Sequence, residues 1–219
     1  DRYGLKLAWW GQAVMDPTSD RIRYVTLDES VVVIQTDLGT VTAFDHNSGK
    51  RLWSAQFGRP NIPSFAVAMN SELVVVPVGV RVYGVDKFSG TLIWQLKLEG
   101  DPSTGPSMDE EQMYIGTVDG TVYAYNLKKV RSSYEDGQDD KWSFLGINWR
   151  YKAGKAVNSP PVTNGVSIAF SSKDGLLYSL DSSDHKLRFQ VETDNAISAP
   201  WKCPRTCCSS RPTGTSRIA

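Results

Sequence analysis

The stretch that decides the fold is AFDHNSGKRLW at residues 43–53, which returns as GVDKFSGTLIW at residues 84–94. Each copy begins with a small residue, has Asp two positions later, continues into Ser-Gly and ends on Trp. Such an Asp can accept backbone N–H groups across a tight turn, and the Gly can adopt the left-handed conformation that closes it. Both copies therefore predict a turn between two strands, with a large aromatic side chain at a fixed place in each unit.

Two weaker copies continue the pattern. AYN at residues 124–126 has Asn in place of Asp, and SLD at residues 179–181 is followed by Asp184-His185 and Phe189 where the first copies have Ser-Gly and Trp. The third unit carries about 14 extra residues within 128–146, and this polar, acidic stretch predicts an inserted surface loop. A repeat with a period of about 40 residues indicates a solenoid or a propeller.

Between these turns the units have the pattern of strands. Continuous apolar runs, typical of strands buried on both faces, occupy residues 30–35, 72–78 and 112–117. Asp119-Gly120 and Asp174-Gly175 are two-residue hairpin signals, because Gly accepts positive φ. One unit is therefore about four strands over about 40 residues with no helix, which is the content of one propeller blade.

Composition limits the classes of function. The 219 residues carry 24 basic and 24 acidic side chains, so no bulk positive charge is available to pair with nucleic-acid phosphates. No apolar run approaches the ~18 residues that a membrane-spanning helix needs. The chain starts at Asp1 without a signal-peptide pattern, so we expect a fragment or a processed chain.

The repeat resembles that of the pyrroloquinoline-quinone-type, or quinoprotein-like, β-propellers, whose units follow Ala-x-Asp-x-x-Thr/Ser-Gly-x-x-x-Trp. The resemblance covers roughly residues 9–201 and implies an all-β fold of four-stranded antiparallel blades. It also implies that the Trp ending each blade packs against the neighbouring blade. The units end near five landmarks: Trp10, Trp53, Trp94, Trp149 and Phe189. About four complete blades with partial ones predict an incomplete ring, a fragment of a seven- or eight-bladed propeller.

This family contains quinone- and Ca²⁺-dependent dehydrogenases, non-catalytic scaffolds of outer-membrane assembly, and sensor domains of larger bacterial proteins. The dehydrogenases have a ring of about eight blades, a catalytic Asp, Ca²⁺ ligands and often adjacent cysteines above the quinone. Cys207-Cys208 matches only the last feature, outside any repeat and without a central acidic cluster. We therefore expect no catalytic, cofactor-binding or metal-binding residues. Pyrroloquinoline quinone and Ca²⁺ enter only under the alternative that the chain is a dehydrogenase fragment.

Other candidate residues are interpreted structurally, with the functional alternative kept for each. His46 and His185 lie at turn positions and are taken as turn residues ahead of metal ligands. Ser48 and Ser89 belong to the turns. We expect three carboxylates to form hairpin turns, with Ca²⁺ binding as the alternative: Asp37, Asp119 and Asp174. We expect the basic-aromatic stretch Arg21, Arg23 and Tyr24 to form a solvated strand face, with a nucleic-acid-binding patch as the alternative. The acidic residues 135–140 are taken as a solvated loop, with partner docking as the alternative.

The last residues do not continue the repeat. Where the period predicts a strand, residues 202–219 contain four basic and no acidic side chains and include Cys203, Cys207 and Cys208. Back-translation in a frame that begins within the Trp201 codon restores a strand, an Asp-Gly turn and a second strand. We therefore interpret residues 202–219 as a frameshift artefact.

The expected function follows from the repeats alone. We predict a non-catalytic propeller scaffold that binds an unidentified protein partner in the periplasm or at the outer membrane of a bacterium. The alternatives are a dehydrogenase fragment and the sensor propeller of a larger protein, whose missing blades lie in the same longer chain. Nucleic acid and membrane-spanning segments are not expected.

Overall fold

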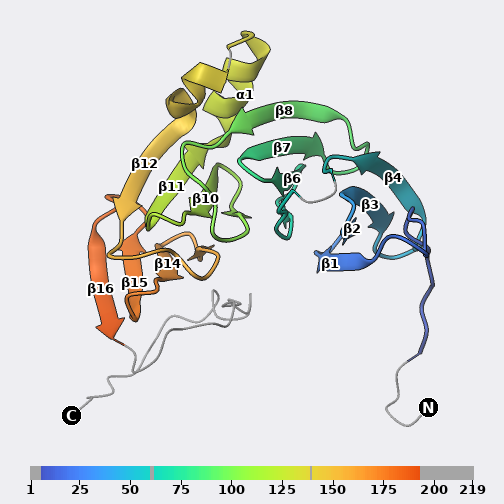
Figure 1. The fold of residues 1–219 in the computed structure, drawn as a ribbon, viewed down its shortest axis with the longest axis horizontal. Coiled ribbons are helices and arrows are strands. Elements are labelled where there is room, and N and C mark those ends of the chain that lie inside the picture. The colour runs from blue at the N-terminus through green and yellow to red at the C-terminus, as the bar shows by residue number, and fades with distance from the viewer. Residues whose placement is uncertain (1–5, 60–61, 139, 193–219) are drawn as a thin grey trace.

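The computed structural model contains four antiparallel sheets of four strands each, which follow one another along an arc (Figure 1). It describes residues 6–59, 62–138 and 140–192. Every sheet consists of four consecutive strands in simple meander order, so each sheet is one sequence unit and one blade. This confirms the prediction of an all-β propeller architecture.

The second to fourth strands have five or six residues in every blade, whereas the first strand has six residues in blade 1 and two in each of the others. Blade 1 contains β1 (Ile22–Leu27), β2 (Val31–Thr36), β3 (Thr40–Asp45) and β4 (Arg51–Gln56). Blade 2 contains β5 (Ala68–Met69), β6 (Leu73–Val78), β7 (Arg81–Asp86) and β8 (Leu92–Lys97). Blade 3 contains β9 (Ser107–Met108), β10 (Gln112–Gly116), β11 (Thr121–Asn126) and β12 (Ile147–Lys152). Blade 4 contains β13 (Val162–Thr163), β14 (Ser167–Ser171), β15 (Leu176–Asp181) and β16 (Leu187–Glu192). The fourth strands lie on the convex side of the arc (Figure 1).

The hydrophobic cores lie between blades. Three clusters of buried residues each join the facing sides of two adjacent sheets. The middle strands are buried on both faces because successive side chains of a strand point to opposite sides. In β6, Val74 and Val76 belong to the cluster shared with blade 1, and Val75 belongs to the cluster shared with blade 3. The continuous apolar runs are thus explained by burial on two sides.

A small residue lies opposite the large aromatic residue in every blade. The cross-strand pairs are Ala43–Trp53, Gly84–Trp94, Ala124–Trp149 and Ser179–Phe189. At Gly84 an added Cβ would lie only 2.1 Å from the Trp94 ring. The small residue that begins each motif copy therefore makes room for the aromatic ring that ends it.

Each Trp of the first three units contacts the next blade, as the resemblance implied. Trp53 Nε1 donates to the carbonyl oxygen of Lys87 at 2.9 Å, with the ring against Gly90. Trp149 stacks on His185 with ring centroids 4.9 Å apart. Trp94 is fully buried in the cluster that contains residues of blade 3. Phe189 is half exposed in β16, where all six residues are exposed.

The aromatic residue that packs on blade 1 lies one position before the predicted Trp10. Trp9, not Trp10, donates its Nε1 hydrogen to the carbonyl oxygen of His46 at 2.8 Å and lies against Gly49. Trp10 is 77% exposed. The choice of Trp10 was therefore wrong, because only one of two adjacent side chains in this segment can face blade 1. Trp9 does for blade 1 what Trp53 does for blade 2.

The insertion is helical, which corrects the expectation of a loop within 128–146 and of units without helix. It consists of α1 (Leu127–Glu135) and the 3₁₀ helix η1 (Asp140–Gly146), on the convex side beside β8 (Figure 1). Asn126 caps α1 by accepting a hydrogen bond from Lys129 N at 3.0 Å. Leu127 and Val130 lie one helical turn apart and are buried in the core between blades 2 and 3.

Candidate functional site

One rim of the arc is built from turns closed by Asp or Asn. In the turn between the first and second strands of each blade, a side-chain Oδ1 accepts backbone N–H groups two and three residues further on, as Asp28 does from Ser30 and Val31 at 2.8 and 2.9 Å. The four residues that do so are Asp28, Asn70, Asp109 and Asn164. This second repeated feature was not predicted, although Asp or Asn recurs in the sequence before each apolar strand.

The motif turns between the third and fourth strands end at the same rim. Asp45 accepts hydrogen bonds from the Ser48 backbone N–H at 2.7 Å and hydroxyl at 2.6 Å, and Asp86 does the same with Ser89. Gly49 and Gly90 have φ of 69° and 71°, the left-handed conformation that the sequence predicted. The bonds from the Ser48 hydroxyl and N–H lower the pKa of the Asp45 carboxyl. These residues therefore act structurally, as interpreted.

The two histidines take different places in these turns. His46 is exposed, and its carbonyl oxygen accepts the hydrogen bond from Trp9. His185 has φ of 59° and stands where the first two units have Gly. Among the described residues no group of three or more His, Cys, Asp or Glu side chains is arranged to hold a metal ion.

The hairpin carboxylates lie at the opposite rim. Asp119 accepts hydrogen bonds from the Lys152 ammonium at 2.7 Å and the Thr121 hydroxyl at 2.8 Å, and Asp174 accepts one from the Tyr178 hydroxyl at 2.7 Å. Burial acts to raise the pKa of Asp119, but these bonds outweigh it and lower that pKa well below its ordinary value. Both Asp-Gly pairs lie in four-residue connections, 117–120 and 172–175, instead of the expected two-residue turns.

The remaining candidates are paired locally. Arg23 lies 3.4 Å from Asp37 and over the Tyr24 ring at 5.5 Å, and Arg21 is exposed beside them. In the insertion, Arg131 and Glu135 form an ion pair at 2.8 Å.

The tail, residues 202–219 with Cys203, Cys207 and Cys208, lies outside the described residues. None of the helices that the structure describes is both long and apolar enough to cross a membrane.

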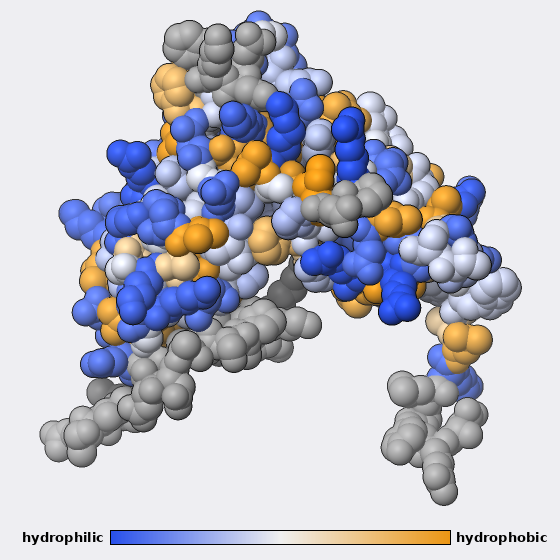
Figure 2. Space-filling model, viewed as in Figure 1, coloured by the Kyte–Doolittle hydropathy of each residue, from blue (hydrophilic) through white to orange (hydrophobic). Residues whose placement is uncertain are grey.

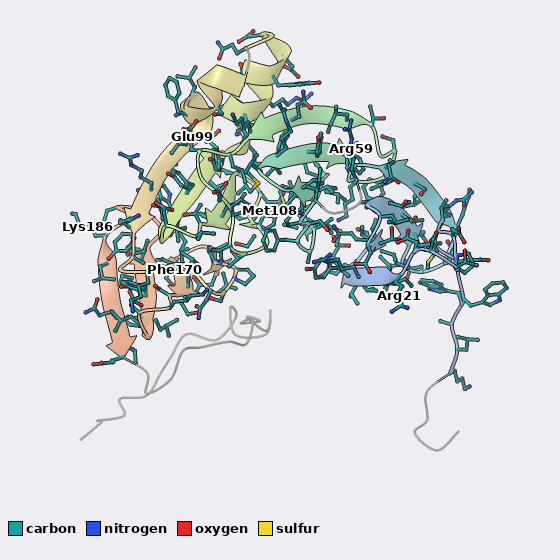
Figure 3. The ribbon with its side chains drawn as sticks, viewed as in Figure 1. Arg21, Arg59, Glu99, Met108, Phe170 and Lys186 are labelled. Carbon is teal, nitrogen blue, oxygen red and sulfur yellow. The ribbon has the colours of Figure 1, made fainter. Side chains whose placement is uncertain are left out.

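The rim with the Asp and Asn turns is hollowed in two adjoining places. An inner hollow of about 450 Å³ lies between the first turns of blades 1, 2 and 3. An outer hollow of about 400 Å³ lies between blades 2 and 3, beside α1. Both are lined by Asn70 and Glu110, so they adjoin at these residues. Figure 3 shows Met108, which lines the inner hollow, at the concave side of the arc.

Lys87 fixes the floor of the inner hollow. Its side chain is nearly buried, forms an ion pair with Asp28 of blade 1 and donates to the carbonyl oxygen of Asn70 at 2.9 Å. Burial acts to raise the pKa of Asp28, but the bonds from Lys87 and from two backbone N–H groups lower it overall. Lys87 occupies the motif position of His46, and its ion pair was not evident from the sequence.

These observations define the class: a β-propeller of pyrroloquinoline-quinone-type repeats, with cores between blades and a hollowed, charged rim. A model of the family described as outer membrane protein assembly factor BamB matches residues 37–148, just over half of the chain, and the chain belongs to this family. A comparison with curated proteins gave no match.

Solved structures confirm the fold. BamB from Moraxella catarrhalis is similar with a TM-score of 0.57 and 21% identity, over 78% of this chain and 50% of that chain. A chain of the mitotic checkpoint complex is similar with a TM-score of 0.64 and 12% identity, over 83% of this chain and 54% of that chain. At these identities the likeness concerns the fold alone. The chain spans about half the length of both.

Proposed function

We propose that this chain is a non-catalytic propeller that binds other proteins in the bacterial cell envelope, at the periplasmic side of the outer membrane. The observation that carries the proposal is the match of residues 37–148 to a family described by outer-membrane assembly. Protein partners are therefore expected, and no cofactor is required.

The arrangement of the rim supports this proposal. Its Asp and Asn side chains are engaged by their own turns, which holds the loops in fixed positions. Rigid loops from several blades, displayed side by side, form the kind of surface on which binding sites are commonly built. On the face seen in Figure 2, hydrophilic side chains dominate and hydrophobic ones form small patches between them.

The first test measures partner binding. The whole chain, immobilised, is incubated with a detergent extract of bacterial envelopes and with a cytosolic extract of equal protein concentration. We expect an envelope protein to be retained in a defined ratio to the chain, and no such protein from the cytosol. Retention of cytosolic proteins only would contradict the envelope location.

The second test addresses the dehydrogenase alternative. The chain is mixed with pyrroloquinoline quinone and Ca²⁺, passed through a desalting column and assayed for quinone absorbance and dye-linked alcohol oxidation. We expect neither the absorbance nor the oxidation above that of a buffer control. Retained quinone with alcohol-dependent dye reduction would replace the scaffold proposal with the enzyme.

A further inference from the structure

We propose that the two adjoining hollows form one binding groove, which takes an extended segment of a partner protein with a basic side chain and an apolar side chain. The proposal rests on the proposed protein-binding function and names its site and the chemistry of its ligand. The rim groove is defined by the residues that line the inner and outer hollows.

The inner part of the rim groove favours a basic side chain. Four carboxylates and one ammonium group line it: Asp28, Glu29, Asp109, Glu110 and Lys87. Lys87 is only 3% exposed, and its ammonium group is engaged by Asp28 and by the Asn70 carbonyl oxygen. The charge facing a ligand is therefore predominantly negative, which attracts a Lys or Arg side chain and accelerates its approach.

The outer part favours an apolar side chain. Its floor contains Leu73 and Ile93, which are partly exposed, above the buried Trp94 and Leu127. Its lining carries both signs of charge, with carboxylates at Glu72 and Glu111 and cationic groups at Lys128 and Arg131. An apolar side chain that covers Leu73 and Ile93 displaces water from apolar surface, while the mixed walls leave the net charge of this part small.

An extended segment fits this shape better than a single compact ligand. The two parts adjoin only at Asn70 and Glu110, so a ligand that fills both must pass along the rim from one to the other. The walls are already fixed: Asn70 and Asp109 are held by hydrogen bonds within their own turns. A preformed groove loses little conformational entropy when a peptide binds.

The outer part of the groove is particular to blades 2 and 3. Its outer wall is α1, which among the described units occurs only in blade 3, where it replaces the motif turn. Lys128 and Arg131 on the exposed side of α1 line the hollow, whereas Leu127 and Val130 anchor the helix in the core. The insertion thus builds a wall that the other described interfaces lack.

The test uses synthetic peptides as probes. Short fluorescent peptides carry one Arg and one Leu, separated by Gly-Ser spacers of increasing length. Two control sets replace Arg by Glu or Leu by Ser. Fluorescence anisotropy with the whole chain measures binding. We expect at least one spacing to bind, either replacement to weaken binding about tenfold, and rising salt to weaken it further.

A matched pair of variants locates the site. Glu110→Lys reverses a charge that both hollows share, and Asp101→Lys makes the same change at an exposed residue of the opposite rim. We expect the first to weaken peptide binding about tenfold and the second to leave it within about twofold. Asp101→Lys should keep the melting temperature of the wild type because its side chain is exposed. Glu110→Lys loses the hydrogen bonds from the Ser71 N–H and hydroxyl and should lower the melting temperature by about 2–4 °C, which leaves it folded in the binding assay.

Two results would overturn the groove. One is the absence of binding at every spacing, and the other is equal binding by the Glu110→Lys and Asp101→Lys variants. The experiment with the envelope extract distinguishes failure of the groove proposal from failure of the proposed function. If wild type and Glu110→Lys retain the same envelope protein equally, the scaffold function is supported and the groove is not its binding site. Quinone-dependent alcohol oxidation would contradict the scaffold function itself.

Discussion

The interface between blades 1 and 2 and the interface between blades 3 and 4 use the same aromatic residue in the same place with different results. Trp53 and Trp149 are 8% and 9% exposed, so both indoles are buried to the same extent. Trp53 Nε1 donates to the Lys87 carbonyl oxygen at 2.9 Å, whereas Trp149 Nε1 has no partner among the described residues. The two interfaces therefore differ in a hydrogen bond, at nearly equal burial.

The residue under the indole explains this difference. Gly90 has no side chain, so the turn of blade 2 lies directly against Trp53. In blade 4 the same place is taken by His185, whose ring stacks on Trp149 at 4.9 Å. The motif Gly therefore closes the turn and also lets the indole come close to the turn backbone. His185 in place of Gly still closes the turn with a positive φ, but it puts a side chain against the indole of Trp149.

Removing the indole of the first interface should have the largest effect. Trp53→Ala deletes a buried aromatic side chain and its hydrogen bond, so we expect the free energy of unfolding to fall by about 3–5 kcal/mol. Urea denaturation followed by fluorescence measures the change. Trp10→Ala is the matched control, because that side chain is 77% exposed and should change stability by less than about 0.5 kcal/mol. Similar losses in both variants would refute the assigned roles of these residues.

Lys87 offers a way to weaken the first interface without touching the indole. Lys87→Met keeps the length of the side chain but leaves the Asp28 carboxylate without its ion-pair partner. We expect a loss of about 3 kcal/mol at neutral pH, since a buried charge without a partner is costly. Ser182→Met, at the corresponding position of blade 4, should cost much less, because the Ser182 side chain is uncharged and its hydroxyl donates to the Gly165 carbonyl oxygen. Equal losses would contradict the role of the ion pair.

Replacing indole by phenyl isolates the hydrogen bond. Trp53→Phe and Trp149→Phe remove similar apolar area, but only the first removes a hydrogen bond. We therefore expect Trp53→Phe to be the more destabilising of the two by about 1–2 kcal/mol in the free energy of unfolding. Parallel urea titrations of the two variants provide the measurement. A larger loss for Trp149→Phe would reverse the comparison.

The smallest expected effect is the pH dependence of stability that the ion pair between Lys87 and Asp28 causes. The pKa of folded Asp28 lies below its ordinary value of 3.8, so its ion pair stabilises the fold above about pH 4 and is lost as the pH falls further. We expect the stability gap between wild type and Lys87→Met to narrow between about pH 5 and pH 2, because the Asp28 carboxylate becomes protonated in that range. Denaturation curves across that range test the sign, and a gap that widens in acid would be inconsistent with it.

Much of the fold could be predicted because it depends on local chemistry. The Asp and Gly of the motif build their turn with nearby groups, so residues 43–53 suffice to predict it. Helix α1 was missed because the polar composition of 128–146 was taken as a loop signal. Asn126 as a cap, followed by Leu127 and Val130 at helical spacing, was a usable indication of a helix.

The candidate site could be predicted far less. The rim groove combines turns at Asp28, Asn70 and Asp109 with α1, and these segments meet only after three blades have packed together. Likewise, the pairing of Lys87 with Asp28 joins two blades and depends on the register of their sheets. Local patterns carry no information about such distances.

The position of the cores between blades has a consequence for how the molecule opens. Each middle blade shares one core with each neighbour, so disturbing a blade affects adjacent sheets first and distant ones only through them. Opening should therefore proceed as local unzipping from β16, whose residues are all exposed, toward the middle of the arc. Amide hydrogens of β6 and β10 should then exchange with solvent later than those of β16, in a gradient along the chain of blades.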